Sequence, residues 1–209
     1  MKWSSGFAYC VGLIATDGCL YSDGKCLCFT SKDLSLVKVF KNLMKLHAKI
    51  GVTVSGQTGN IASRIQWIDR DLYKDLVSIG ITSNKSKTIG KLLIPNIFFF
   101  DFLRGVFDGD GSFYSYHDKR FGTFLWYLTF NSASEKHILW LRKELKKRLH
   151  VYGHISKAKK SSVYSLRYGK KEGLHIINKM YYSSQVPCLK RKFQKIKNAQ
   201  VVKLVYTHP

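Results

Sequence analysis

A nine-residue pattern that occurs twice constrains the fold of this chain more than any other feature of its sequence. The first copy reads CVGLIATDG at residues 10–18, and the second reads LRGVFDGDG at residues 103–111. Each copy contains an apolar run, carries glycine at its third position and ends in Asp-Gly. The repeat predicts two similar halves, each opening with a helix that ends near Asp17 or Asp110.

The sequences that follow the two copies also resemble each other. Apolar and polar residues alternate there, as they do in half-buried strands. The alternating segments are residues 25–32, 61–68, 124–132 and 162–169. A helical pattern separates the strands of each half, and short helices are expected at residues 72–79 and 174–181. A short insertion is expected near residues 116–122 of the second half.

These patterns predict an α+β fold in which each half runs helix, two strands, helix, two strands, helix, helix. The expected link is Pro95-Asn96. It divides the chain into a first half at residues 1–95 and a second half at residues 96–209.

The charge of the chain indicates the class of its partner. There are 35 Lys and Arg against 13 Asp and Glu, a formal net charge of +22, and a field of that strength favours a polyanion. The excess is spread over both halves and is not confined to a tail. A membrane-surface protein would be expected to line its cations along one amphipathic helix, so no membrane partner is expected.

Cysteine usage and hydropathy indicate the compartment. No apolar stretch approaches the roughly 18 residues that cross a bilayer, and no clear secretory signal opens the chain. The five cysteines include no C-x-x-C pair, which argues for a reducing interior and against a zinc module. The expected location is intracellular, in a bacterial or phage cytoplasm or an organelle, and not secreted.

One face of each predicted sheet is suited to a core and the other to polar contacts. Trp126, Leu128 and Phe130 share one face of their strand, and the side chains between them point the other way. Ordinary solvent exposure would explain one such face, but two matched faces in a chain of this charge favour nucleic acid. The candidate DNA-binding residues are Cys26, Cys28, Thr30, Arg64, Gln66, Tyr127, Thr129, Asn131, Ser165 and Arg167. Arginine, glutamine and asparagine make bidentate contacts to purine edges in the major groove.

Each Asp-Gly corner places a carboxylate at the C-terminal end of a helix, where the helix dipole disfavours negative charge. The same unfavourable choice in both halves predicts that the charge has a task, which a divalent cation would complete. We expect Gly18 and Gly111 to adopt the left-handed conformation that ends many helices. A simple turn without chemistry is the alternative for each corner.

Small residues along the two motif helices predict how these helices pack. Gly12 lies four residues from Ala8 and from Thr16, and Gly105 lies four residues from Gly109. Such a stripe lets two helix backbones approach closely, which would bring the two motif aspartates side by side. Two adjacent carboxylates beside a phosphate favour divalent metal binding through oxygen and metal-assisted phosphodiester hydrolysis.

The two nonapeptides resemble the paired motifs of LAGLIDADG homing endonucleases, and the similarity covers nearly the whole chain. The resemblance implies two pseudo-symmetric αββαββα units with the motif helices at their interface and the sheets as a saddle in the DNA major groove. It also implies a monomeric, intron-encoded enzyme that binds double-stranded DNA and uses Mg²⁺, with Mn²⁺ or Ca²⁺ as substitutes for binding. Its product would be a double-strand break with short 3′ overhangs in a long target site.

The same resemblance implies roles at the motif ends. Asp17 and Asp110 would bind the metal, and the carbonyls of Thr16 and Gly109 would face it. The sixth motif position is Ala15 in one copy and an aspartate in the other, and it is not the shared metal ligand.

Polar and basic residues near the strand ends are further candidates by resemblance. After the second strand the first half offers Ser31-Lys32, whereas the second half offers Ser132-Ala133 and lacks the lysine. The candidate catalytic lysines are Lys32, Lys85, Lys87, Lys190 and Lys192. For those after the fourth strand of each half, a surface role without catalysis is the alternative.

Two other functions compete with a nuclease on this scaffold. An RNA maturase would bind intron RNA and assist splicing, and the surviving pair of aspartates favours the nuclease over it. A regulator of transcription would be expected to add a helix-turn-helix, for which the sequence leaves no room after Gln200.

Overall fold

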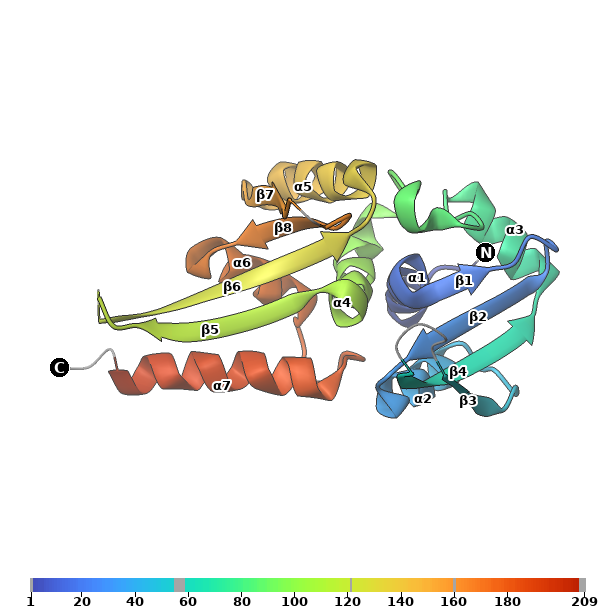
Figure 1. Cartoon of the computed structure of the whole chain (residues 1–209), viewed down its shortest axis with the longest axis horizontal. Coiled ribbons are helices and arrows are strands. Elements are labelled where there is room, and N and C mark those ends of the chain that lie inside the picture. Colours follow the sequence, from blue (N-terminus) through green and yellow to red (C-terminus); the bar gives the residue numbers. More distant parts are fainter. Residues whose placement is uncertain (1, 55–58, 121, 160, 207–209) are drawn as a thin grey trace.

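The computed structural model describes residues 2–54, 59–120, 122–159 and 161–206. Within these residues the chain forms seven α-helices and two four-stranded antiparallel sheets. Figure 1 shows helices α1 and α4 side by side at the centre of the molecule, with one sheet on each side of them. The predicted α+β fold with two similar halves is confirmed.

The first half begins with the first motif helix. Its elements are α1 (Ser5–Asp17), β1 (Gly18–Leu20), β2 (Cys26–Ser31), α2 (Leu34–Leu43), β3 (Ile50–Val54), β4 (Ile61–Ile68) and α3 (Arg70–Ser78). A 3₁₀ turn, η1 (Lys85–Lys87), follows in this half, and a second one, η2 (Asn96–Phe98), opens the second half. The prediction of a last helix in this half is therefore wrong, because only the short turn η1 forms after α3.

The second half repeats this order, with a longer first hairpin and a longer helix after it, and adds a final helix. They are α4 (Phe99–Asp110), β5 (Ser112–Asp118), β6 (Thr123–Ser132), α5 (Glu135–Leu149), β7 (His154–Lys157), β8 (Tyr164–Tyr168), α6 (Lys170–Met180) and α7 (Lys190–Tyr206). Helix α7 runs along β5 (Figure 1). None of the helices in the described ranges is long and apolar enough to cross a membrane.

Both sheets have the same strand order, which is the structural counterpart of the sequence repeat. The orders are β1-β2-β4-β3 and β5-β6-β8-β7, with every neighbouring pair antiparallel. The predicted insertion lengthens one hairpin, since the β5–β6 pairing extends to Asp118 and Thr123. Residue 121 of that insertion lies outside the described residues.

One face of each sheet packs against its helices, as the alternation predicts. Phe29 is fully buried and stacks on Phe40 of α2 with ring centroids 4.4 Å apart. In the second half Leu128 and Phe130 are fully buried, and Phe130 contacts Phe107 of α4 edge-on. Each such side chain contributes roughly 1.5–3 kcal/mol to folding.

The motif helices cross at their third-position glycines. A Cβ on Gly12 would lie 2.2 Å from the carbonyl oxygen of Phe102, and a Cβ on Gly105 would lie 2.1 Å from that of Tyr9. No side chain larger than hydrogen fits these contacts, so both glycines are required for the observed packing. The close helix approach predicted from the small-residue stripe is present.

The expectation for the glycines after each motif aspartate is wrong. Gly18 has φ −82° and ψ 157°, and Gly111 has φ −74° and ψ 161°, so both are extended and lead directly into a strand. Lack of space explains these glycines instead. A Cβ would lie 2.6 Å from Cα of Ile14 in one half and 2.7 Å from Cα of Phe107 in the other.

Candidate active site

The two motif aspartates meet at the C-terminal ends of α1 and α4. Asp17 is the last residue of α1, and Asp110 is the last residue of α4. A Cβ on Gly109 would lie 2.9 Å from Oδ2 of Asp17 and 2.0 Å from Oγ1 of Thr16. Because the helix ends touch, the carboxylates of Asp17 and Asp110 repel each other.

The surroundings disfavour negative charge on both carboxylates. Burial, together with the negative charge of Asp110, raises the pKa of Asp17 to about 7. Loss of solvent on one side also raises the pKa of Asp110, although its side chain opens onto a pocket. The cations of Lys85 and Lys192 act in the opposite direction on both groups. A further cation would therefore stabilise the charged pair.

Two pockets of similar volume flank the aspartates, and both halves of the chain contribute to each. The Asp17 pocket has a volume of about 360 Å³ and includes Gly109 of the other motif. The Asp110 pocket has a volume of about 370 Å³ and includes Thr16 of the other motif. Each pocket thus combines the eighth residue of one motif with the seventh residue of the other.

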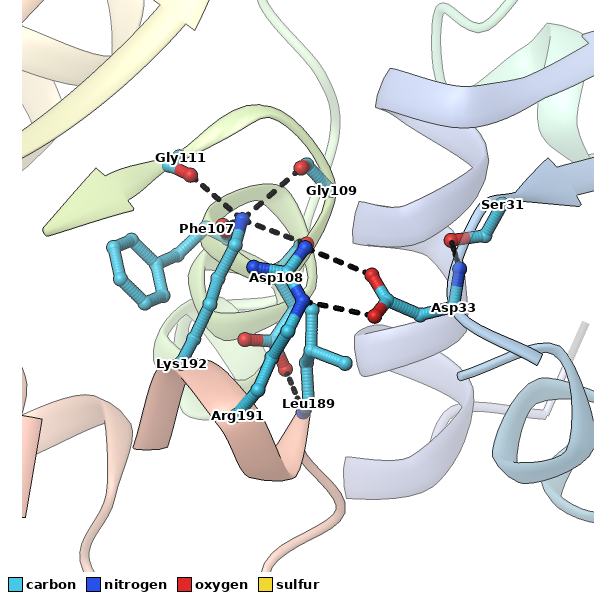
Figure 2. A network of polar contacts seen from close by, with 9 residues as sticks. All are labelled: Ser31, Asp33, Phe107, Asp108, Gly109, Gly111, Leu189, Arg191 and Lys192. Atoms are coloured by element: carbon cyan, nitrogen blue, oxygen red, sulfur yellow. Dashed lines mark hydrogen bonds and ion pairs between the residues drawn. The ribbon is translucent and has the colours of Figure 1, made fainter. Parts of the chain in front are cut away.

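The side chain of Lys192, a residue of α7, reaches the C-terminal end of α4. It is 9% exposed, and its three N–H donors are shared among the carbonyl oxygens of Phe107, Asp108, Gly109 and Gly111, which lie 2.7, 2.9, 3.1 and 2.6 Å from Nζ (Figure 2). The last carbonyls of a helix have no partner within the helix, and a cation there complements the helix dipole. Burial lowers the pKa of Lys192 to about 8.

The side chain of Lys85, a residue of η1, reaches the C-terminal end of α1 in the same way. It is 5% exposed, and its Nζ donates to the carbonyls of Gly18 at 2.5 Å and Thr16 at 3.4 Å. Burial lowers the pKa of Lys85. The neighbouring candidates Lys87 and Lys190 are both exposed. The structure thus separates the four lysines into two that reach the helix ends and two that do not.

Two exposed cations line the Asp17 pocket. Lys32 directly follows β2, and Arg191 lies in the first turn of α7. The guanidinium of Arg191 donates two hydrogen bonds of 2.8 Å to the carboxylate of Asp33, which joins the second half to the first (Figure 2). Ser31 accepts a hydrogen bond from the backbone N–H of Asp33 at 3.2 Å.

The open face of the first sheet carries the predicted polar residues. The guanidinium of Arg64 donates to the hydroxyl of Tyr21 and, at 3.0 Å, to the side-chain carbonyl of Gln66. Gln66 is exposed, and Arg64 is half-buried. Cys26 and Thr30 on β2 are also half-buried, whereas Cys28 is only 6% exposed.

The open face of the second sheet carries an aromatic and basic cluster. Arg167 is exposed and lies over the rings of Tyr114 and Tyr127, 5.8 and 5.4 Å from their centroids. Asn131 donates to the backbone carbonyl of Asp110 at 2.8 Å and accepts from the hydroxyl of Ser165 at 2.7 Å.

Burial reduces the access of two predicted DNA contacts. Thr129 is 5% exposed, and Cys28 is similarly covered. The strand alternation placed both on the open faces, but neighbouring side chains cover them. Their access to a large partner is lower than the alternation predicts.

A buried network around Asp108 was not found from the sequence. Its carboxylate accepts a hydrogen bond of 2.7 Å from the hydroxyl of Tyr9 on α1. It accepts another of 2.7 Å from the backbone N–H of Leu189 (Figure 2). Tyr181 donates a longer one at 3.4 Å. Asp108 therefore fixes the start of α7 against both motif helices. In the sequence, the acid at the sixth motif position was the only feature that could have indicated this network.

A fully buried arginine was also missed. Arg104 pairs with Asp101 at 2.7 Å and donates to the carbonyls of Met180 at 2.6 Å and Pro187 at 2.9 Å. A charged pair spaced three residues apart on an otherwise apolar helix could have indicated it. Its carbonyl partners are far away in the sequence and could not have been identified.

The donor set at the aspartates suits a hard divalent cation. Mg²⁺ is commonly bound by one or two carboxylates together with waters and substrate phosphates, and two carboxylates with disfavoured charge stand here beside open pockets. In the described part of the chain no group of three or more His, Cys, Asp or Glu gathers as a metal cage. Asp17 and Asp110 would therefore need oxygen from water or a phosphate to complete a metal site.

Comparisons with solved structures identify this fold. The meganuclease I-SmaMI bound to uncleaveable DNA matches with a TM-score of 0.64 at 15% identity, over 98% of this chain and 92% of that one. The I-LtrWI LAGLIDADG homing endonuclease bound to target DNA matches with a TM-score of 0.57 at 13% identity, over 96% and 89% of the two chains.

A third match has a different name. The N-terminal LAGLIDADG domain of DUF199/WhiA matches with a TM-score of 0.57 at 18% identity, over 88% of this chain and 85% of that one. No family model and no curated protein sequence matches the chain. The fold implied by the two motifs is confirmed as the two-half LAGLIDADG fold.

Proposed function

We propose that this chain, which has the fold of LAGLIDADG homing endonucleases, is a metal-dependent endonuclease that cuts both strands of a long DNA site and leaves 3′ overhangs. One observation carries the proposal. Asp17 and Asp110 meet at the ends of α1 and α4, and each opens onto a pocket that contains residues of both halves. Two equivalent sites of this kind suit a substrate with two equivalent strands.

Asp17 and Asp110 would hold Mg²⁺ or a substitute divalent ion, with the carbonyls of Thr16 and Gly109 nearby. A bound divalent ion supplies phosphate polarisation and lowers the pKa of its water. An I-SmaMI structure bound to uncleaved DNA in the presence of calcium ions supports divalent binding by this fold.

The chain's own residues account for the remaining electrostatics. Lys85 and Lys192 neutralise the carbonyl ends of both motif helices and stabilise the charged form of both aspartates. Lys32 lines the Asp17 pocket, where its ammonium group would offset the charge that develops on a phosphate under attack.

The open sheet faces would bind the duplex. Arg64, Gln66 and Arg167 belong to residue types that read purine edges, and the net charge of +22 would neutralise phosphates. One chain supplies both halves of both pockets, so we also propose that it acts as a monomer. The homing function would also imply that the chain is encoded in an intron, and this origin is part of the same proposal.

The test uses a randomised duplex library, because such a library requires no assumption about the DNA sequence that is cut. Purified protein is incubated with the library in Mg²⁺ or in EDTA, and the ends produced are sequenced. The proposal predicts paired ends with short 3′ overhangs and one recurrent long sequence, in Mg²⁺ only. Ends without a common sequence, or equal cutting in EDTA, would contradict it.

RNA binding is measured in parallel by gel shift, since a maturase would use the same scaffold. The nuclease proposal predicts tighter binding to the recovered duplex than to structured intron RNA at equal salt. Preference for the RNA, with no recovered duplex, would favour the maturase.

A further inference from the structure

The two pockets match residue for residue over most of their lining. Ser31 and Ser132 end the equivalent strands β2 and β6, and Ala62 and Val163 occupy equivalent places at or just before β4 and β8. Their volumes of about 360 and 370 Å³ are nearly equal. Space and backbone therefore do not distinguish the two pockets.

Charge does distinguish them. Lys32 follows β2 and lines the Asp17 pocket, whereas Ala133 follows β6 and lines the Asp110 pocket. Arg191 also lines the Asp17 pocket, where Asp33 balances its charge. No lysine or arginine lines the Asp110 pocket among the residues that the structure describes.

The buried lysines do not remove this difference. Lys85 and Lys192 stand at equivalent helix ends, and each interacts electrostatically with both aspartates. Their contributions are therefore shared between the pockets. Among the residues that the structure describes, Lys32 thus remains as an exposed cation that lines the Asp17 pocket without an ion-pair partner, and the Asp110 pocket has no counterpart.

We infer that the two strands are cut at unequal rates, and that the strand whose phosphate occupies the Asp17 pocket is cut first. The inference rests on the proposed endonuclease function. Hydrolysis forms a bond from the water oxygen to phosphorus and breaks the bond from phosphorus to the 3′ oxygen. The water loses a proton and the leaving oxygen gains one.

Lys32 would act on this step through charge. Negative charge increases on the phosphate oxygens and on the leaving oxygen as the bond breaks, and a nearby ammonium stabilises that state more than the ground state. The Asp110 pocket has only the methyl group of Ala133 at that place. Nicked duplex should therefore accumulate before the double-strand break.

The experiment follows each strand of the recovered duplex with its own fluorescent label, under single-turnover conditions in Mg²⁺. The wild-type chain should cut one strand about tenfold faster than the other, which is less than the roughly 10²–10³-fold effect of a buried oxyanion donor because Lys32 is exposed. Lys32→Ala should slow only the faster strand by about the same factor. Ala133→Lys should accelerate only the slower strand, which a merely structural role of Lys32 would not produce.

Lys38→Ala is the matched control, because Lys38 is an exposed lysine on α2 that lines neither pocket. It should leave both strand rates unchanged. Equal rates for the two strands in the wild type, or equal slowing of both strands by Lys32→Ala, would overturn the inference while leaving the endonuclease in place. Absence of any metal-dependent cutting would instead overturn the proposed function.

Discussion

Gly12 of α1 and Gly105 of α4 lie in backbone contact, so that a Cβ on Gly12 would lie 2.9 Å from the Cα of Gly105. This contact sets the separation of the motif helices along their length. The separation in turn determines that the two carboxylates at the helix ends face one cluster of pockets. Chemistry at the aspartates therefore depends on packing one to two helical turns away from them.

Gly105→Ala tests this dependence. The added methyl group would meet the carbonyl of Tyr9, and overpacking of this kind should lower the free energy of unfolding by about 3 kcal/mol. Urea unfolding measures the change. Gly51→Ala is the control, since the atom nearest to its Cβ would be 4.0 Å away, and it should be nearly neutral. Equal effects of the two substitutions would contradict the close-packing account.

Lys192→Met should destabilise the chain by about 2 kcal/mol, because it leaves the buried carbonyls at the end of α4 without their donor. Lys190→Met, in the same turn of α7 but exposed, should change the free energy of unfolding by less than about 0.5 kcal/mol. Thermal or urea unfolding of both variants gives the comparison. A Lys190 variant as unstable as the Lys192 variant would argue against the capping role.

His137 should make stability depend on pH. Its Nδ1 lies 2.8 Å from the carbonyl of Gly90, so that nitrogen carries the proton and donates, and burial lowers the pKa of the ring to about 4. The unfolded histidine, with an ordinary pKa of about 6.5, binds a proton between these values while the folded one does not. The contribution of neutral His137 to the free energy of unfolding is thus fully present above pH 6.5 and is lost as the pH falls toward 4.

The expected loss from His137 is about 3 kcal/mol between pH 7 and pH 4. Unfolding free energies of the wild type and of His137→Asn, measured across this range, isolate it from the other titrating groups. The wild type should lose more stability than the variant on acidification. Parallel curves would show that His137 does not titrate as its burial requires.

Divalent ions should stabilise the chain through Asp17 and Asp110. At a tenfold excess over Kd the gain would be about 1.4 kcal/mol, and Ca²⁺ titration with thermal unfolding measures it. Asp17→Asn should abolish the gain, while Asp71→Asn, exposed at the start of α3, should keep it. A gain that survives Asp17→Asn would place the ion elsewhere.

Without divalent ions the same variant should be more stable than the wild type. A carboxyl whose folded pKa is raised to about 7 destabilises the fold at neutral pH, and this penalty disappears as the pH falls toward 4. Asp17→Asn should therefore raise the free energy of unfolding at pH 7 by about 1–2 kcal/mol, after discounting for its half-exposed side chain. The difference from the wild type should shrink on acidification.

The repeat made much of this fold predictable. Alternation located β4 at Ile61–Ile68 without error, and the small residues around Gly12 and Gly105 predicted which helices pack together. These features depend on local periodicity, which a single sequence carries. The resemblance of the two motifs to LAGLIDADG endonucleases was correct for the fold.

Features that depend on the path of the chain in space were not predictable. Lys85 and Lys192 reach the helix ends while Lys87 and Lys190 do not, and only the turn taken after each sheet decides this. The extended conformation of Gly18 depends on β1 starting directly at the helix end. Composition and spacing contain neither fact.

The central claim is that Asp17 and Asp110 act together in cutting duplex DNA. The most direct measurement is cleavage of the recovered duplex in Mg²⁺ by the wild type, Asp17→Asn and Asp110→Asn, with gel shift in Ca²⁺ to confirm binding. We predict that each variant binds the duplex within about threefold of the wild type, because both aspartates lie at the helix ends and off the open sheet faces, and yields no double-strand break. Linear product from Asp110→Asn at the wild-type rate would contradict the account.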